Sequence, residues 1–150
     1  MGKKILCVIL TLMMMALVAC GGKEEKALTN KAEFENSTLE LLDATIADTD
    51  DGRTVVKIIA NYTNETSEGG YAYSYFKVKA FQNDMEIADV SDINGEEAAL
   101  IQSVKDGASL QVHYVFELTD NGEVDVKVYT PTADEVLIAE KLYTFGAESE

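Results

Sequence analysis

The sequence contains little cysteine, histidine, proline or tryptophan, and the first two absences exclude several kinds of chemistry. Only two of its 150 residues are cysteines, Cys7 and Cys20, and both lie near the start. Residues 21–150 therefore hold no thiol that could form a disulfide or bind zinc. Because His113 is the only histidine, we expect no zinc centre and no cofactor.

Positive charge is also scarce. Lys and Arg number 12 against 27 Asp and Glu, which gives a net charge of -15. The first 19 residues carry two lysines and no acid, so the rest of the chain has a net charge of -17. Nucleic-acid binding depends on Lys and Arg side chains that neutralise phosphates. The composition therefore excludes nucleic acid as a partner.

The start of the chain has the pattern of an export signal. Lys3 and Lys4 precede an almost entirely apolar run from Ile5 to Ala19. A helix of this length rises about 22 Å, which is shorter than the ~30 Å hydrocarbon core of a bilayer. The pattern predicts a signal peptide over residues 1–19.

The last residues of the run and the cysteine after them, Leu17-Val18-Ala19-Cys20, resemble the lipobox of bacterial lipoproteins. The resemblance implies cleavage between Ala19 and Cys20 and a lipid on the Cys20 sulfur. Two acyl chains anchor a protein stably where one chain is marginal, so we expect anchoring on the outer face of the cell membrane. The alternatives are a signal peptide with a different cleavage site and an uncleaved signal anchor.

Two further segments follow the signal peptide. Residues 20–36 are polar, with Leu28 and Phe34 as the only large apolar side chains, and they are expected to form a flexible, lipid-anchored tether. Residues 37–150 are enough for one domain with a substantial core and too few for two. We therefore expect a single domain over 37–150.

Apolar and polar residues alternate through this domain, which is typical of antiparallel strands with one buried face. The clearest runs are 54–62, 110–118 and 124–128, and further strands are expected at 39–47, 73–81, 85–88 and 135–145. About seven strands predict an all-β fold, an antiparallel β-sandwich, with a barrel as the alternative. Residues 95–102 are either one helical turn or part of a crossing loop.

Turn-forming pairs separate these runs, namely Asp51-Gly52, Asn83-Asp84, Asn94-Gly95, Asp106-Gly107 and Asn121-Gly122. Such residues tolerate the positive φ angles that tight turns require. Asn121-Gly122 stands between two alternating runs, the pattern that predicts a β-hairpin.

The residues of the domain do not form a recognisable catalytic arrangement. A catalytic histidine needs a nucleophile and an orienting carboxylate within hydrogen-bond reach. Ser109 and Glu117 lie near His113 in the sequence, but no motif links the three. The alternation places His113 on the exposed face of its strand, and we expect a non-enzymatic protein.

Carboxylates gather in the turn that contains Asp48, Asp50 and Asp51. Oxygen ligands of this kind suit calcium, but their spacing does not fit the EF-hand loop. The turn is therefore a weak calcium candidate beside its simpler interpretation as an acidic turn.

Three tyrosines offer a candidate ligand or partner surface. Tyr71, Tyr73 and Tyr75 share one parity on the expected strand, and Phe76 and Val78 share the other, which suits the core. The tyrosines would then form an exposed ladder that contacts a glycan or a protein partner. The alternative is that tyrosine simply suits a strand.

With strands and turns assigned, the domain resembles a family of Gram-positive lipoproteins that carry an immunoglobulin-like domain of unknown function. The similarity lies in the order of short motifs from about residue 39 to residue 129, namely Asp48–Gly52, Asn61-Tyr62-Thr63-Asn64-Glu65-Thr66, Phe81-Gln82-Asn83 and Lys105-Asp106-Gly107-Ala108-Ser109. One departure is Asp84, where the family usually has glycine, and it leaves the type of that turn open. The resemblance implies an extracellular, immunoglobulin-like β-sandwich and no particular chemistry.

These inferences lead to an expected function at the cell envelope. The protein is expected to be a membrane-anchored, non-catalytic binding or accessory module, held at the membrane by lipid on Cys20. An envelope protein or glycan is its expected partner. The alternative is an inhibitor or regulator of a secreted or envelope enzyme. A binding module predicts a concave surface near the tyrosines, whereas an inhibitor predicts a protruding, rigid loop.

Overall fold

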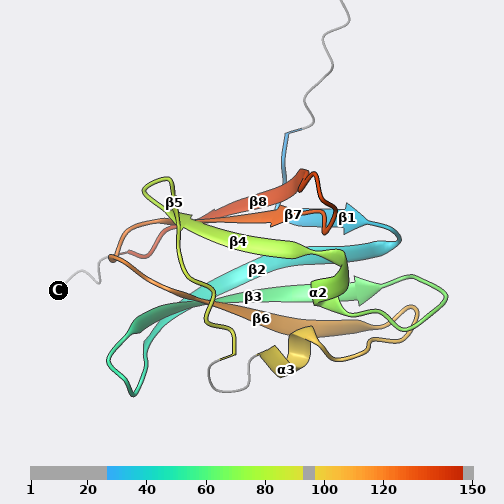
Figure 1. Ribbon diagram of the computed structural model, residues 1–150, viewed down its shortest axis with the longest axis horizontal. Helices are drawn as coiled ribbons and strands as arrows, with labels where there is room; N and C mark the ends of the chain where they lie inside the picture. Colours follow the sequence, from blue (N-terminus) through green and yellow to red (C-terminus); the bar gives the residue numbers. More distant parts are fainter. Residues whose placement is uncertain (1–26, 93–96, 147–150) are drawn as a thin grey trace, which may run out of the picture.

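The computed structural model describes residues 27–92 and 97–146 and has the expected all-β architecture, with two antiparallel sheets that form a β-sandwich (Figure 1). One sheet has the strand order β1-β2-β3-β6 and the other β5-β4-β7-β8. The strands are β1 (Lys31–Phe34), β2 (Ser37–Asp48), β3 (Thr54–Asn64), β4 (Lys77–Gln82), β5 (Met85–Glu86), β6 (Ser109–Glu117), β7 (Val124–Tyr129) and β8 (Leu137–Tyr143). Two short helices, α2 (Ala72–Tyr75) and α3 (Glu97–Leu100), lie between strands.

The alternation in the sequence correctly predicts the buried faces of β3 and β6. β3 pairs with β6 in a register that places Val56 opposite Phe116 and Ile58 opposite Tyr114. These four side chains are buried, with at most 4% of their surface exposed. Full burial of one large apolar side chain contributes about 1.5–3 kcal/mol, so the core rests on such inward positions of both sheets.

Two hairpins have the turn geometry that favours the twist of antiparallel strands. Glu35 and Asn36 join β1 to β2, and Asn83 and Asp84 join β4 to β5, all four with positive φ angles. Positive φ at both central residues defines a type I′ turn. Asp84 has a φ of 63°, so an aspartate occupies the position at which glycine was expected from the family resemblance.

β1 corrects the expected boundary between tether and domain. Residues 31–34, which the polar composition assigned to the tether, pair with β2, and Ala32 is fully buried. A four-residue edge strand has too few apolar positions to show a period-two pattern. The chain therefore enters the sandwich before residue 37.

The pair Asn121-Gly122 does not form the predicted hairpin. β6 and β7 belong to different sheets, and residues 118–123 cross between them. Gly122 lacks a positive φ, but a Cβ atom there would lie 2.7 Å from the Asp120 carboxylate, which accepts a hydrogen bond from the Gly122 N–H. The glycine permits a close approach rather than a turn angle.

Gln82 fixes this crossing from the end of β4. Its amide nitrogen donates to the Asp120 carbonyl at 3.2 Å, and its amide oxygen accepts from the Thr119 N–H at 2.8 Å and from the Thr119 hydroxyl at 3.0 Å. Asn83 adds a bond to the Asp120 carboxylate at 2.8 Å. Only 2% of the Gln82 surface is exposed, so a buried amide with several partners joins the two sheets here.

Asn64 has the same role at the opposite end of the sandwich. Its amide nitrogen donates to the carbonyls of Glu68 and Val104, each at 2.7 Å, and its amide oxygen accepts from the Thr66 hydroxyl at 2.7 Å. The Gly107 N–H donates to the Asn64 carbonyl at 2.7 Å. Asn64 is fully buried and joins the end of β3 to two loops, including the loop that leads into β6.

The chain changes sheets after β5, which ends at Glu86, two residues earlier than expected. Segment 87–92 then runs along β6, where the Ala88 carbonyl accepts from the Glu117 N–H and the Val90 N–H donates to the Val115 carbonyl (Figure 1). Val90 covers Val55 and Val115 in a small apolar cluster apart from the main core. The segment thus leaves β4 and attaches itself to the other sheet.

Candidate functional site

A groove lies between β4 and segment 87–92. β4 supplies Lys77–Lys79, segment 87–92 supplies Asp89, Ser91 and Asp92, and α3 supplies Glu97 and Leu100. Its volume is about 860 Å³, and its remaining lining residues are Tyr73, Phe76, Glu86, Ile101, Tyr114 and Pro131. The groove combines apolar side chains with several charged ones, as ligand sites commonly do.

Tyr114 of β6 lines this groove with a side chain whose hydroxyl is buried. Only 4% of its surface is exposed, and its hydroxyl has no hydrogen-bond partner among the described residues. Burial raises the pKa of the Tyr114 phenol well above its ordinary value, and the negative charge of Asp89 raises it further. The hydroxyl therefore stays protonated and can donate a hydrogen bond.

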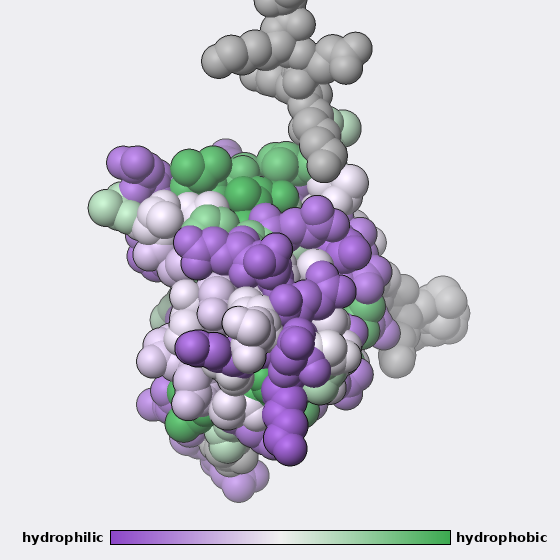
Figure 2. Space-filling model, turned by 90° about the vertical axis from the view of Figure 1, so that its right-hand side faces the viewer, coloured by the Kyte–Doolittle hydropathy of each residue, from purple (hydrophilic) through white to green (hydrophobic). Residues whose placement is uncertain are grey.

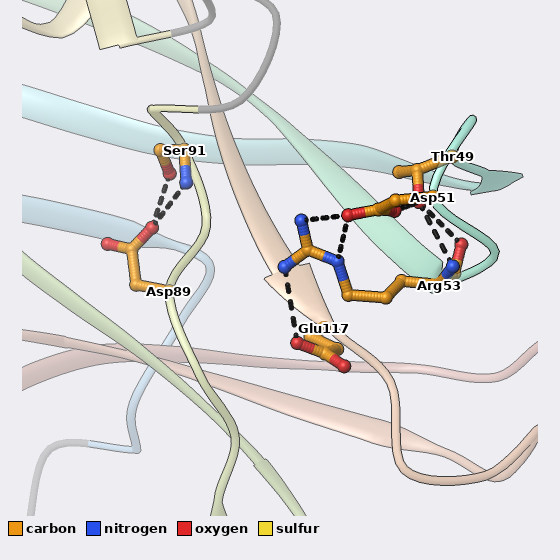
Figure 3. A network of polar contacts seen from close by, with 6 residues as sticks. All are labelled: Thr49, Asp51, Arg53, Asp89, Ser91 and Glu117. Atoms are coloured by element: carbon orange, nitrogen blue, oxygen red, sulfur yellow. Dashed lines mark hydrogen bonds and ion pairs between the residues drawn. The ribbon is translucent and has the colours of Figure 1, made fainter.

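The carboxylate of Asp89 is held in a fixed orientation at the groove (Figure 3). Its Oδ1 accepts from the Ser91 N–H at 2.9 Å and from the Ser91 hydroxyl at 2.6 Å. The Ser91 hydroxyl oxygen in turn accepts from the Val115 N–H at 2.9 Å. Figure 3 shows the second carboxylate oxygen of Asp89 directed away from Ser91, and this oxygen remains able to accept a bond.

The two lysines of the groove already have partners of opposite charge. Lys79 lies 2.9 Å from Glu135 and 3.7 Å from Glu86, and Lys77 also bonds to Glu135. These bonds to Lys77 and Lys79 lower the pKa of the Glu135 carboxyl. The remaining acidic residues of the groove therefore determine its net charge, which is negative.

The structure separates the three tyrosines that the sequence placed in one ladder. Residues 72–75 form α2 instead of the expected strand, which begins only at Lys77. Tyr73 is 59% exposed and lines the groove, and Tyr71 packs beside it with ring centroids 6.4 Å apart. Tyr75 is half-buried against the core. Ala72 and Phe76 share a buried face in either geometry, because four residues span both one helical turn and two strand repeats.

The acidic turn forms a compact network at the tip of the β2–β3 hairpin rather than a cluster of free carboxylates (Figure 3). Arg53 lies 2.6 Å from Asp51 and 3.5 Å from Glu117. Hydrogen bonds from Arg53 and Thr49 hold the pKa of the Asp51 carboxyl well below its usual range. Arg53 thus ties the hairpin to the end of β6.

Asp48 accepts a hydrogen bond from the Thr54 hydroxyl at 2.9 Å, and Asp50 is exposed. In the part of the chain that the structure describes, no group of three or more His, Cys, Asp or Glu side chains is arranged to hold a metal ion. The three carboxylates of the weak calcium candidate are therefore not assembled into a metal-binding cluster.

His113 is half-buried rather than fully exposed, and it has an interaction partner. The residues that flank it in the sequence pair elsewhere. The Ser109 hydroxyl bonds to the Thr63 hydroxyl at 2.7 Å, and Glu117 pairs with Arg53. The structure does not place the serine and the glutamate in a catalytic arrangement with the histidine.

Sequence reasoning missed Asp89 and Tyr114 as members of a site. Asp89 was part of an acidic stretch without a motif, and Tyr114 occupied an inward strand position typical of the core. The signal in the sequence that could have found the site was the hydroxyl of Tyr114, because the hydroxyl of a buried tyrosine usually has a hydrogen-bond partner. Only the structure shows that this hydroxyl has none within residues 27–92 and 97–146.

The proposed lipid site at Cys20 and the cleavage site after Ala19 lie outside the described residues. The described residues contain no helix long and apolar enough to cross a membrane. Figure 2 shows a band of hydrophilic residues across one end of the molecule, with hydrophobic ones gathered mainly near its upper edge.

Comparison with known families gives one match over most of the chain. The model of a family described as a domain of unknown function, DUF5067, matches residues 23–130. No curated protein matches the sequence closely enough to count as a relative.

Solved structures share the fold at low sequence identity. A candidate lipoprotein from Staphylococcus aureus is 12% identical, with a TM-score of 0.57 over 77% of this chain and 88% of that chain. A protein from Enterococcus faecalis is 17% identical, with a TM-score of 0.54 over 78% of this chain and 90% of its own. A candidate lipoprotein from Bacillus subtilis is 10% identical, with a TM-score of 0.51 over 81% of this chain and 40% of that chain.

Proposed function

The chain belongs to the DUF5067 family, and we propose that it is a lipid-anchored lipoprotein of the cell envelope that acts as a non-catalytic binding module. Two of the solved structures with this fold are candidate lipoproteins of Gram-positive bacteria. The lipobox residues 17–20 follow the signal-like run at the start of the chain. The sequence therefore supports the location and the lipid attachment, and the groove supports binding.

The observation that carries the binding role is the groove beside α2. Tyr73, with its exposed ring, and Tyr114, whose buried hydroxyl has no partner among the described residues, both line it. A rigid aromatic ring and a small number of polar groups in a concave surface are typical of ligand recognition. A concave surface near the tyrosines is what a binding module predicts, so the groove supports that role.

Anchoring is tested on the chain expressed in a Gram-positive host with a labelled fatty acid. The unsubstituted chain is expected to incorporate the label and to begin at Cys20 by mass spectrometry. Cys20→Ala is expected to remove the label, whereas Cys7→Ala is expected to keep it, because Cys7 is cleaved off with the signal peptide. Retention of the label in Cys20→Ala contradicts lipid anchoring at this residue.

Binding is tested with the mature chain carrying Cys20→Ala, added to isolated cell envelopes in a sedimentation assay. Tyr73→Ala is expected to weaken binding at least tenfold, because an aromatic anchor at the centre of a site commonly supplies 2 kcal/mol or more, about thirtyfold in affinity. Tyr71→Ala is the matched control, since this tyrosine is also exposed but does not line the groove. Equal losses in the two variants contradict the assignment of the groove.

The tip of the β2–β3 hairpin supports a second candidate, a regulator of an envelope or secreted enzyme. The hairpin projects beyond the sheets in Figure 1, and Arg53 bonds it to Asp51 and Glu117. A projecting loop held in one conformation is suited to insertion into a partner's cleft. If Arg53→Gln weakens envelope binding and Tyr73→Ala does not, this candidate replaces the groove.

A further inference from the structure

The side of β4 that faces the groove is a strand edge that pairs with no described strand at Val78. β5 pairs only with Phe81 and Gln82, and the next bond along this edge runs from the Ile87 N–H to the Ala80 carbonyl at 2.9 Å. Beyond Ile87 the chain turns away to β6. Among the described residues, no strand continues the sheet at this point.

The register determines which backbone groups this edge presents. Along an antiparallel strand, hydrogen-bonding residues alternate between the two neighbours. Because Gln82 and Ala80 bond towards β5 and segment 87–92, the N–H and carbonyl of Val78 point to the same side. Val78 lines the groove, and its two backbone groups are therefore directed towards it.

Among the described residues, the groove thus contains a second kind of polar group without a hydrogen bond on this side, the backbone of Val78, in addition to the Tyr114 hydroxyl. Buried backbone and side-chain polar groups are nearly always hydrogen-bonded in folded proteins. Here a strand edge at Val78 and a buried phenol at Tyr114 line one concave surface. A ligand that bonds to both the Val78 backbone and the Tyr114 hydroxyl must supply hydrogen-bond donors and acceptors spaced as they are along a peptide backbone.

We propose that the groove binds an extended, basic peptide segment, which adds as a short strand to the free edge of β4 at Val78. The inference rests on the proposed binding role and names the class of partner. In this mode the backbone of the peptide pairs with the strand edge, and its alternate side chains enter the site. A glycan lacks a regular ladder of amide groups to match the edge of β4.

The side chains of the groove define the sequence that such a peptide carries. A residue paired with Val78 directs its side chain to the same face of the sheet as Val78, towards the interior where Tyr114 lies. There the Tyr114 hydroxyl donates to an acceptor, which a threonine, serine or asparagine side chain provides.

Charge favours basic residues elsewhere in the peptide. Four carboxylates line the groove, those of Glu86, Asp89, Asp92 and Glu97, against two lysines that are already paired with acids. The whole chain has a net charge of -15. A basic peptide is therefore attracted to this surface and an acidic one is repelled.

The experiment uses the mature chain with Cys20→Ala, labelled for NMR, and a synthetic peptide of alternating lysine and threonine. The peptide is expected to shift the resonances of groove residues and to slow amide exchange of Val78 at least tenfold, because that N–H becomes bonded. An alternating glutamate and threonine peptide is expected to bind at least tenfold more weakly. The same lysine–threonine peptide with N-methylated alternate amides is expected not to bind, since it cannot pair with the strand.

Two matched variants distinguish a hydrogen bond made in the groove from the general effect of removing a buried tyrosine hydroxyl. Tyr114→Phe is expected to lower the affinity for the peptide about threefold to tenfold, the effect of one hydrogen bond. Tyr143→Phe is expected to leave affinity unchanged, because the buried Tyr143 hydroxyl also has no partner in the described part of the chain but lies outside the groove. Equal losses in the two variants, or an unchanged exchange rate at Val78, overturn the proposal.

A soluble peptidoglycan fragment is titrated in parallel to distinguish the proposed function from this inference. If the glycan shifts the groove resonances and no peptide does, the groove is a binding site but its partner is not a peptide. If neither binds at millimolar concentration, both the groove assignment and the peptide proposal are wrong.

Discussion

Buried polar side chains at the two ends of the sandwich are hydrogen-bonded, whereas one buried hydroxyl at the groove has no partner among the described residues. At the two ends, the amides of Asn64 and Gln82 are buried and engaged on both their donor and acceptor sides. In the groove, the Tyr114 hydroxyl is equally buried and has no partner among the described residues. The difference separates polar groups that specify the fold from one that the described residues leave without a hydrogen bond.

Each of the two amides bonds to a loop or crossing that strand pairing does not join to its own strand. Gln82 bonds to the crossing from β6 to β7, and Asn64 bonds to the loops around residues 68 and 104. A satisfied buried network fixes one arrangement, because each alternative leaves a polar group without a partner. The motifs on which the family resemblance of the sequence rests contain both residues, and their role here is structural.

Replacing Asn64 with alanine is expected to give the largest effect. The change removes a donor from the carbonyls of Glu68 and Val104 and an acceptor from Thr66, in a site with no exposed surface. We expect a loss of about 3–4 kcal/mol in the free energy of unfolding, measured by denaturant melts. Asn61→Ala on the same strand is the control, and it is expected to cost about 0.5 kcal/mol or less.

The variant Gln82→Met tests the opposite end of the sandwich. Methionine keeps the volume but cannot bond to Thr119 or Asp120, so a loss of about 2–3 kcal/mol is expected. Amide exchange should increase most at residues 118–122 if the amide fixes that crossing. A uniform increase along the chain would show that Gln82 matters only as part of the core.

The variant Tyr114→Phe tests the difference between the groove and the ends of the sandwich most directly, because it removes only the hydroxyl. Since that group has no partner among the described residues, the free energy of unfolding is expected to change by about 0.5 kcal/mol or less. A denaturant melt measures this difference alongside Gln82→Met. If the two variants lose similar stability, the hydroxyl is bonded in solution and the distinction between the ends and the groove fails.

The smallest effect on stability is expected at the exposed network of Arg53, Asp51 and Glu117, where solvent screens the charges. Because the pKa of Asp51 is lowered in the folded chain, its contribution is present above the ordinary value of 3.8 and is lost as pH falls through the folded pKa. Carbon NMR titration should show Asp51 ionised below pH 3.8, and Arg53→Gln should return its pKa towards that value. An unchanged pKa in Arg53→Gln would contradict the role of the guanidinium.

Period-two alternation was enough to predict the sandwich, because inward side chains of long strands must be apolar whatever the connections. It could not assign the crossing at Asn121-Gly122, since a glycine that allows close approach looks like a glycine that allows positive φ. Nor could it separate a helical turn from a strand at Tyr73 and Tyr75. Those differences depend on partners far away in the sequence, such as Gln82 for the crossing.

The candidate site was predictable only in part. Tyr73 was identified because exposed aromatic side chains commonly mark recognition surfaces, and it lines the groove. The strand edge at Val78 arises because segment 87–92 changes sheets, which the residues of β4 do not encode. The exposed position of Asp89 likewise depends on its bonds to Ser91.

The entry of the chain into the sandwich has a mechanical consequence. The Thr29 carbonyl accepts from the Glu140 N–H of β8 at 3.0 Å, and the Asn30 carbonyl accepts from the Leu41 N–H of β2 at 2.8 Å. β8 and β2 belong to different sheets. A pulling force on the N-terminal segment therefore reaches both sheets before it reaches β1, and this arrangement resists the peeling of a four-residue edge strand.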